Sequence, residues 1–261
     1  MRETCDILVV EDEPSVQRAV VMICTEEGLQ VDAVDEAGKA LELLKQKNYR
    51  LVLCDVMLPG MDGFGLLEEL SHGGRTVPVV MMTGYSTMEN AVKSLSLGAL
   101  DYIPKPFTAD ELLTVIQRSI RSGVILGDAE AARLEGQRSF EFVACPSGYR
   151  SLGYVSWVLM EDEGTAKIGI NDLFVKTVDG IDGIELSAQG EVLVQGVPCA
   201  VVTARDGSTH HVMCPMGGKI IEVNADVLSD PSLVEKDPYF RGWLYQVLPS
   251  NPDSNLQWLS S

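Results

Sequence analysis

Residues 51–63 read Leu-Val-Leu-Cys-Asp-Val-Met-Leu-Pro-Gly-Met-Asp-Gly, an apolar segment that reaches the acidic residue Asp55 and continues into a Pro-Gly turn. A short run of consecutive apolar residues is typical of a strand buried on both faces of a parallel sheet. Ligands of open α/β sheets bind beyond the carboxyl ends of the strands, which is where Asp55 lies. This stretch therefore predicts an α/β domain with a functional site at Asp55.

Four further apolar runs lie around this one within residues 1–121, and amphipathic segments separate them. The expected strands are 6–10, 30–34, 51–54, 77–82 and 100–103. Helices are expected after Pro14 and after Asp35, and the last one begins at Thr108, whose spacing to Glu111 predicts a capping box. The alternation predicts a doubly wound, five-stranded parallel (βα)5 fold.

Charged and hydroxyl side chains follow the ends of several expected strands: Glu11 and Asp12 the first, Asp55 the third, Thr83 the fourth and Lys105 the fifth. If the strand order is 2-1-3-4-5, the first and third strands are neighbours and their acids converge. Converging carboxylates repel each other and favour binding of a hard cation such as Mg²⁺. One carboxylate can then attack a phosphoryl donor while the cation, the ammonium and the hydroxyl neutralise the transition state.

Four blocks of residues 1–121 have a familiar order and spacing. They read Leu-Val-Val-Glu-Asp-Glu-Pro at 8–14, Cys-Asp-Val-Met-Leu-Pro-Gly-Met-Asp-Gly at 54–63, Met-Thr-Gly-Tyr at 82–85 and Asp-Tyr-Ile-Pro-Lys-Pro-Phe at 101–107. Together they resemble the receiver domain of bacterial response regulators. The resemblance implies that Asp55 is the phosphoacceptor. It also implies that Asp12 and the Met57 carbonyl bind Mg²⁺, with Glu11 assisting through water.

The resemblance assigns further roles beside the phosphoacceptor. Thr83 and Lys105 would contact the phosphoryl oxygens and complete the catalytic set with Asp55. Tyr102 would turn inward when Thr83 moves, and the Lys105–Pro106 peptide is expected to be cis. Taken singly, an acid after a strand is more often a helix cap. The joint occurrence of these residues on the matching strand ends favours the receiver interpretation.

The second half of the chain has a different pattern. Residues 122–146 are expected to form a linker with one short helix at 128–137, and residues 147–261 a mainly β domain with Asp-Gly turns at 179–180, 182–183 and 206–207. Segments at 149–157, 166–173, 180–190 and above all 214–248 resemble the glycine-cleavage H protein. This resemblance covers about 149–248 and implies a lipoyl-type β module.

The residue that carries lipoate in that family is a lysine at a hairpin tip, and the aligned position here is Gly207. No lysine occurs between Lys176 and Lys219. Arg205 cannot substitute, because a guanidinium stays protonated and does not form the amide. No lipoate is therefore expected, and a protein-binding module is the favoured interpretation of this domain.

Composition restricts the possible functions. The net charge is −18, and acidic residues outnumber basic ones in both halves, so a basic DNA-binding face is not expected. No apolar run is long enough for a membrane span, and the start does not resemble a signal peptide. The six cysteines form no CxxC pair. Free thiols in a cytoplasmic protein are expected.

The sequence favours a two-component response regulator that is not an enzyme and whose phosphorylation switches the protein–protein interactions of an unlipoylated H-like output domain. Its expected partners are a sensor histidine kinase or phosphotransfer protein and an unidentified target of the output domain. A second copy, bound through residues 86–97 and 108–121, is a further candidate partner. Neither nucleic acid nor membrane is expected as a partner. Two alternatives remain open: a phosphate-regulated lipoyl carrier, and a phosphate sink with an inert second domain.

Overall fold

The computed structural model describes residues 4–72, 77–84, 88–135 and 142–260. The chain divides into two compact units, which are described separately. The first unit comprises Met1–Ser86 and Leu97–Gly127, and the second Thr87–Ser96 and Asp128–Ser261. No helix of the described residues is both long and apolar enough to cross a membrane.

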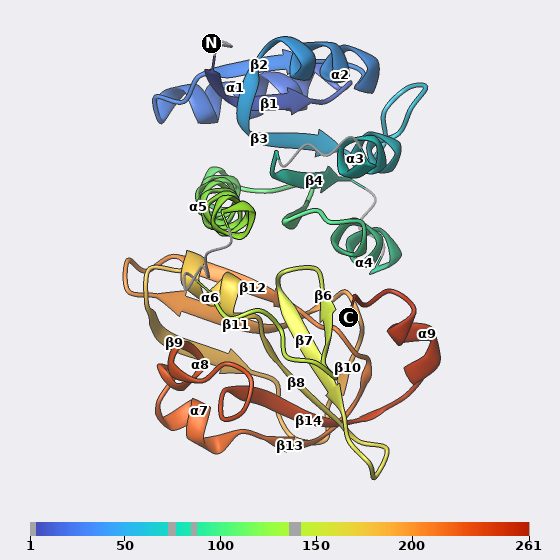
Figure 1. The fold of residues 1–261 in the computed structure, drawn as a ribbon, viewed down its shortest axis with the longest axis vertical. Coiled ribbons are helices and arrows are strands. Elements are labelled where there is room, and N and C mark those ends of the chain that lie inside the picture. The colour runs from blue at the N-terminus through green and yellow to red at the C-terminus, as the bar shows by residue number, and fades with distance from the viewer. Residues whose placement is uncertain (1–3, 73–76, 85–87, 136–141, 261) are drawn as a thin grey trace. The chain divides into compact units, whose positions relative to one another are not determined.

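The first unit contains a parallel sheet of five strands (Figure 1). The strands are β1 (Thr4–Val10), β2 (Val31–Val34), β3 (Asn48–Asp55), β4 (Val79–Thr83) and β5 (Asp101–Pro104). Their order is β2-β1-β3-β4-β5, and every pairing between neighbours is parallel. The predicted doubly wound fold is confirmed, and the strand order is the one on which the expected convergence of the acids depends.

Helices α1 (Pro14–Glu26) and α5 (Ala109–Leu134) pack against one face of this sheet, and the connections also contain α2 (Ala37–Gln46) and α3 (Gly63–His72). Alternate residues of β1 and β3, such as Ile7 and Leu51, enter a core with Val20 of α1 and Leu112 of α5. This core holds β1 and β3 side by side, so that their carboxyl ends meet at one edge.

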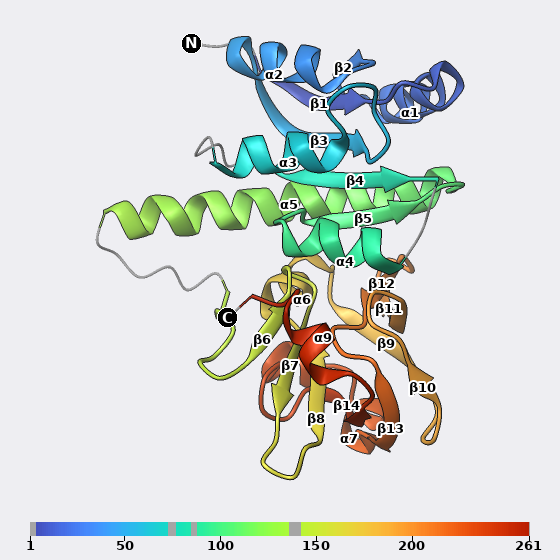
Figure 2. The same ribbon diagram turned by 90° about the vertical axis from the view of Figure 1, so that its right-hand side faces the viewer.

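The end of the receiver-like segment differs from the expectation. The sequence predicts a break after residue 121 and a separate short helix at 128–137, whereas α5 is a single helix of 26 residues (Figure 2). Residue 137 lies outside the described part of the chain. Two glycines suggested the break, but Gly123 has a packing role, because a Cβ there would lie 2.3 Å from Cγ of Pro78. The predicted capping box is confirmed: Thr108 Oγ1 accepts from the Glu111 amide at 3.2 Å.

The second unit is mainly β, as the sequence predicts. Its six-stranded sheet has the order β10-β13-β14-β8-β7-β6, and its three-stranded sheet the order β12-β11-β9. The strands are β6 (Arg150–Leu152), β7 (Ser156–Met160), β8 (Ala166–Ile170), β9 (Ile181–Leu186), β10 (Val192–Leu193), β11 (Pro198–Ala204), β12 (Thr209–Met213), β13 (Gly218–Val223) and β14 (Trp243–Pro249). The helices are α4 (Met88–Ser96), α6 (Asp172–Thr177), α7 (Ala225–Ser229), α8 (Leu233–Lys236) and α9 (Pro252–Leu256).

An aromatic cluster fixes the core of the six-stranded sheet. The Tyr149 and Trp157 rings meet edge to face with centroids 5.0 Å apart, and Tyr239 joins them. Trp157 is fully buried, and its Nε1–H donates to the Ile170 carbonyl at 3.0 Å. Gly169 lies under this indole, where a Cβ would be 2.3 Å from Trp157 Cζ2. These aromatic residues belong to the core.

The contact between α5 and Pro78 can be tested with a matched pair of glycines. We expect Gly123→Ala to lower the free energy of unfolding by about 1–3 kcal/mol, because the added methyl would overlap Pro78. Gly127→Ala is the control, since nothing lies within 4 Å of its Cβ position, and alanine should add about 0.5–1 kcal/mol there through helix propensity. Urea unfolding measures both. Equal effects would contradict the continuous, packed α5.

Candidate functional site

Three carboxylates meet at the carboxyl ends of β1 and β3. Glu11 and Asp12 follow β1, Asp55 ends β3, and the parallel register pairs Val10 with Cys54 just before them. Ligand oxygens of the three acids lie within 4.8 Å of one another. Glu11 is fully buried and Asp55 is 5% exposed, whereas Asp12 is open to solvent. The predicted convergence of acids is thus present in the structure.

Lys105 supplies the cation of this cluster. Its Nζ donates to Glu11 Oε2 at 2.5 Å and lies 3.2 Å from Asp55 Oδ1, within ion-pair range but outside hydrogen-bond geometry. The Lys105 amide also donates to the Thr83 carbonyl at 2.7 Å, which fixes the segment after β5 to the end of β4. The Lys105–Pro106 peptide is cis, as predicted.

The surroundings of the cluster disfavour the ionised form of its two buried carboxyl groups. Burial raises the pKa of Glu11 despite its hydrogen bond to Lys105. Burial likewise raises the pKa of Asp55, and the Lys105 charge opposes this shift. Asp55 Oδ1 is buried and accepts no hydrogen bond from the described residues. An all-oxygen donor set with one neutralising ammonium and one unsatisfied carboxylate oxygen fits a hard divalent cation such as Mg²⁺.

Two further residues, Gly63 and Gln17, shape the site, and no role was predicted for either. A Cβ on Gly63, the first residue of α3, would lie 2.1 Å from the Asp55 carbonyl oxygen, so only glycine lets α3 start this close to β3. Gln17 Nε2 donates to the carbonyls of Glu11 and Val34, at 2.8 and 3.0 Å, and ties the end of β1 to β2. The Gly at the end of the 54–63 block was the available signal for the first contact.

The remaining predicted residues lie along the same edge or next to it. Thr83 ends β4 and is fully buried, one residue beyond the Met82 that pairs with Asp55. Tyr102 of β5 is 5% exposed, its hydroxyl finds no hydrogen-bond partner among the described residues, and burial raises its pKa to about 12. Met57 follows Asp55 by two residues, and its side chain is exposed.

A buried ion pair next to Tyr102 was also missed. Arg118 of α5 bonds through Nη2 to Asp101 Oδ2, and both side chains are almost fully buried. Asp101 Oδ1 also accepts from the Tyr102 amide at 2.9 Å. The pair therefore joins the start of β5 to α5, directly beside the aromatic residue assigned to the switch. Asp101 lies in the 101–107 block, but nothing local in the sequence indicates Arg118 as its partner.

The position aligned with the lipoyl lysine is at a hairpin tip, as predicted. Strands β11 and β12 pair from Thr203 and Thr209 onward, and the turn between them closes with the Gly207 amide donating to the Ala204 carbonyl at 3.0 Å. Gly207 has φ +85°, and nothing lies within 4 Å of its Cβ position. Arg205 packs instead against Gly180, whose Cβ position is 2.7 Å from the guanidinium carbon.

Comparison with known proteins divides the chain in the same way. The response regulator receiver domain model matches residues 7–117, and the glycine cleavage H-protein model matches residues 149–261. A putative NtrX-like response regulator of Rickettsia bellii is 34% identical over 116 residues, which are 44% of this chain and 24% of the relative. The chain spans only about a quarter to a half of the length of the curated relatives that it matches.

Solved structures resemble each half separately. The receiver domain of NtrX from Brucella abortus is 38% identical, with a TM-score of 0.43, and covers 44% of this chain and 98% of its own. A glycine cleavage system H protein from Mycobacterium marinum is 27% identical, with a TM-score of 0.38, and covers 41% of this chain and 87% of its own. On the family matches, residues 7–117 belong to the response regulator receiver domain family and residues 149–261 to the glycine cleavage H-protein family.

Proposed function

We propose that this chain is a two-component response regulator that accepts a phosphoryl group on Asp55 from a histidine kinase or a phosphotransfer protein. The observation that carries the proposal is the state of the Asp55 carboxylate. One of its oxygens is buried, accepts no hydrogen bond from the residues that the structure describes, and lies 3.2 Å from the Lys105 ammonium and beside two further acids. Such an oxygen has a free lone pair for attack on phosphorus.

The residues have separate tasks in this reaction. Asp55 forms the new P–O bond as the donor's leaving group departs, and Lys105 and Thr83 neutralise the phosphoryl oxygens. Glu11, Asp12, Asp55 and the Met57 carbonyl would hold Mg²⁺, which supplies positive charge to the transferred group when bound. Lys105 already contacts Glu11 and Asp55, so only a small movement is needed to reach a phosphoryl oxygen.

The second module is proposed to act as an unlipoylated output domain that binds a protein partner. This proposal is supported by the tip of the β11–β12 hairpin, where Gly207 has no side-chain amine to which lipoate could be joined. The proposed bounds are 1–121 for the receiver, 122–146 for the connection and 147–261 for the module. Helix α5 continues into the connection as far as Leu134. Thr83 and Tyr102 would form the switch, and residues 86–97 and 108–121 would change on phosphorylation or pair with a second copy. Of the segment 86–97, residues 86 and 87 lie outside the part of the chain that the structure describes.

Phosphorylation can be tested by labelling with acetyl phosphate. We expect Mg²⁺-dependent labelling that is stable in acid and labile in base, as an acyl phosphate is, and we expect Asp55→Asn to abolish it. Asp62→Asn is the matched control, because this exposed acid lies in the same loop and should leave labelling intact. Intact mass and peptide mapping measure the result. Full labelling of Asp55→Asn would refute the assignment.

The buried carboxylate also predicts a dependence of stability on pH. Folding raises the pKa of Asp55, so its contribution to stability is complete below the unfolded pKa of about 4 and is lost as pH rises through the folded pKa. Without Mg²⁺, Asp55→Asn should therefore melt at a higher temperature than the wild type at pH 7, and this gain should shrink towards pH 4.

The control for this experiment is Glu163→Gln, which neutralises an exposed acid and should change the melting temperature little at any pH. Addition of Mg²⁺ at pH 7 should raise the melting temperature of the wild type more than that of Asp55→Asn. A wild type that is more stable than Asp55→Asn at pH 7 without Mg²⁺ would contradict the charge imbalance at the site.

The output domain is expected to remain unmodified when the full chain is produced together with a lipoate ligase. The reason is the absence of an amine at the hairpin tip, so the intact mass should equal that of the unmodified chain. Gly207→Lys restores the amine at this position and serves as the positive comparison. A lipoyl mass increase on the wild type would favour the carrier function over the binding function.

A further inference from the structure

Residues 142–146 precede the module in the proposed division of the chain, but their contacts are with the module. Cys145 packs against the aromatic cluster that contains Tyr149 and Tyr239. The Pro146 carbonyl accepts a hydrogen bond from the Tyr149 amide at 3.1 Å. The segment is therefore attached to the module before β6 begins.

Both main-chain groups of Val143 are hydrogen-bonded to side chains of the module. The Val143 amide donates to Asp172 Oδ2 at 2.6 Å, and the Val143 carbonyl accepts from the Tyr239 hydroxyl at 2.9 Å. The same hydroxyl accepts from the Asp172 amide at 3.3 Å, so the two side chains belong to one network. The Val143 residue is 60% exposed. The network thus binds the main chain of this residue and leaves its side chain in solvent.

The module itself positions these two side chains. Asp172 is 2% exposed and lies in the first turn of α6. The neighbouring Asn171 donates from Nδ2 to the Ser156 carbonyl at 3.2 Å, which fixes the start of α6 to β7. Tyr239 is buried, and its carbonyl accepts from the Tyr149 hydroxyl at 3.0 Å. Both side chains are thus held by contacts that do not involve residues 142–146.

Burial makes the two groups depend on a main-chain partner. The Asp172 carboxylate has little contact with water, so the amide of the segment replaces hydration that folding has already removed. Burial raises the pKa of Tyr239, so its hydroxyl stays protonated and donates. Departure of the segment would leave a buried carboxylate without the Val143 amide, which is more costly than the loss of a hydrogen bond in water. The arrangement therefore favours an occupied site.

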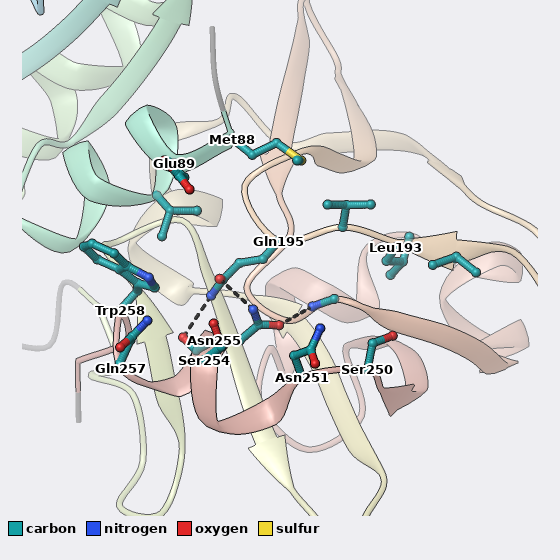
Figure 3. A pocket seen from close by; sticks show the side chains of 14 residues that line it. Met88, Glu89, Leu193, Gln195, Ser250, Asn251, Ser254, Asn255, Gln257 and Trp258 are labelled. Carbon is teal, nitrogen blue, oxygen red and sulfur yellow. Dashed lines mark hydrogen bonds between the residues drawn. The ribbon is translucent and has the colours of Figure 1, made fainter.

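Helix α9, which follows β14, is held on the module by a different kind of contact (Figure 3). Gln195 Nε2 donates to the Asn255 carbonyl at 3.0 Å, and Asn255 Nδ2 donates to Gln195 Oε1 at 2.9 Å. Asn255 Oδ1 also accepts from the Gly217 amide at 2.9 Å. This contact requires one particular side chain on the attached segment, whereas the contact at Val143 requires main-chain atoms alone.

We propose that Asp172 and Tyr239 form a binding site for the main chain of an extended peptide segment, and that residues 142–146 of the chain itself occupy it. The site takes an N–H and a C=O from one residue and excludes proline at that position. Its occupation makes residues 142–146 part of the module, so only residues 135–141 connect α5 to it. A shorter connection raises the effective concentration of the receiver at the module, and this inference does not rest on phosphorylation of Asp55.

The exchange rate of the Val143 amide in the full-length chain, measured by NMR, tests the site. We expect Tyr239→Phe to speed this exchange about tenfold, because it removes the hydroxyl that binds the Val143 carbonyl. Tyr149→Phe is the matched control, since it removes a hydroxyl of the same cluster that bonds to Tyr239 and not to Val143. It should change the rate less than about twofold.

Amides of β7 and β14 report in the same spectra whether the module is folded. If they stay protected and the Val143 amide exchanges alike in the wild type and in Tyr239→Phe, the site is refuted. If Tyr239→Phe unfolds the module, substitutions of Val143 decide instead.

Val143→Pro removes the donated N–H, whereas Val143→Ala keeps both main-chain groups and changes an exposed side chain. The three tryptophans of the chain all lie in the module, so their fluorescence follows its unfolding by urea within the full-length chain. We expect Val143→Pro to raise the unfolding equilibrium constant at least about tenfold, and Val143→Ala less than about threefold. Equal effects of the two substitutions would refute the site.

A second substitution separates the site from a general effect of proline. Asp172→Asn alone should destabilise the module, but added to Val143→Pro it should recover part of the loss. The reason is that an unpaired buried amide costs less than an unpaired buried carboxylate. If the two substitutions act additively, Asp172 and Val143 do not form one site and the proposal is wrong.

Small-angle X-ray scattering on the full-length chain tests the shortened connection. Val143→Pro should have a larger radius of gyration than Val143→Ala, because release of residues 142–146 lengthens the connection. Equal radii would refute the effect on the connection, and the exchange and unfolding experiments would still decide the binding site.

Discussion

Three carboxylates meet at the ends of β1 and β3, and Lys105 is the only cation of the described residues that pairs with them, through Glu11 and Asp55. This shortage of positive charge governs the receiver site. The core between the sheet, α1 and α5 forces the two strand ends together, so the acids cannot separate to relieve their repulsion. Folding energy from apolar packing therefore maintains an electrostatically unfavourable pocket. A divalent cation bound between these acids would relieve the imbalance of charge.

Much of this arrangement is predictable from the sequence, because strand ends and their polar residues are local features. The five alternating segments predict the doubly wound fold, and with the strand order 2-1-3-4-5 they place Glu11, Asp12 and Asp55 together, as in the structure. The Asp101–Arg118 pair was not predictable, since its partners are 17 residues apart and only the packing of α5 on β5 joins them. The predicted end of the last receiver helix at residue 121 was wrong, because Gly123 was interpreted as a helix breaker and α5 continues to Leu134.

In the second module, too, short sequence motifs predict local structure only where no distant contact overrides them. Of the three expected Asp-Gly turns, Gly180 and Gly207 have the positive φ of turn glycines, whereas Gly183 lies inside β9 opposite Thr203. Pairing with a neighbouring strand overrides the turn preference of the dipeptide there. The hairpin position of Gly207 was predictable from the resemblance, but the packing of Gly169 under the Trp157 indole was not, because it depends on the register of β7 and β8.

The backbone at the hairpin tip also determines what a side chain at residue 207 would cost. Gly207 has a left-handed conformation, which a residue with a side chain adopts at a cost of about 1–2 kcal/mol. A lysine substituted at this position would therefore carry this strain, although nothing lies within 4 Å of its Cβ position. The reach of an amine placed at residue 207 would thus be set by the strain of this turn as well as by its place at the end of the β11–β12 hairpin.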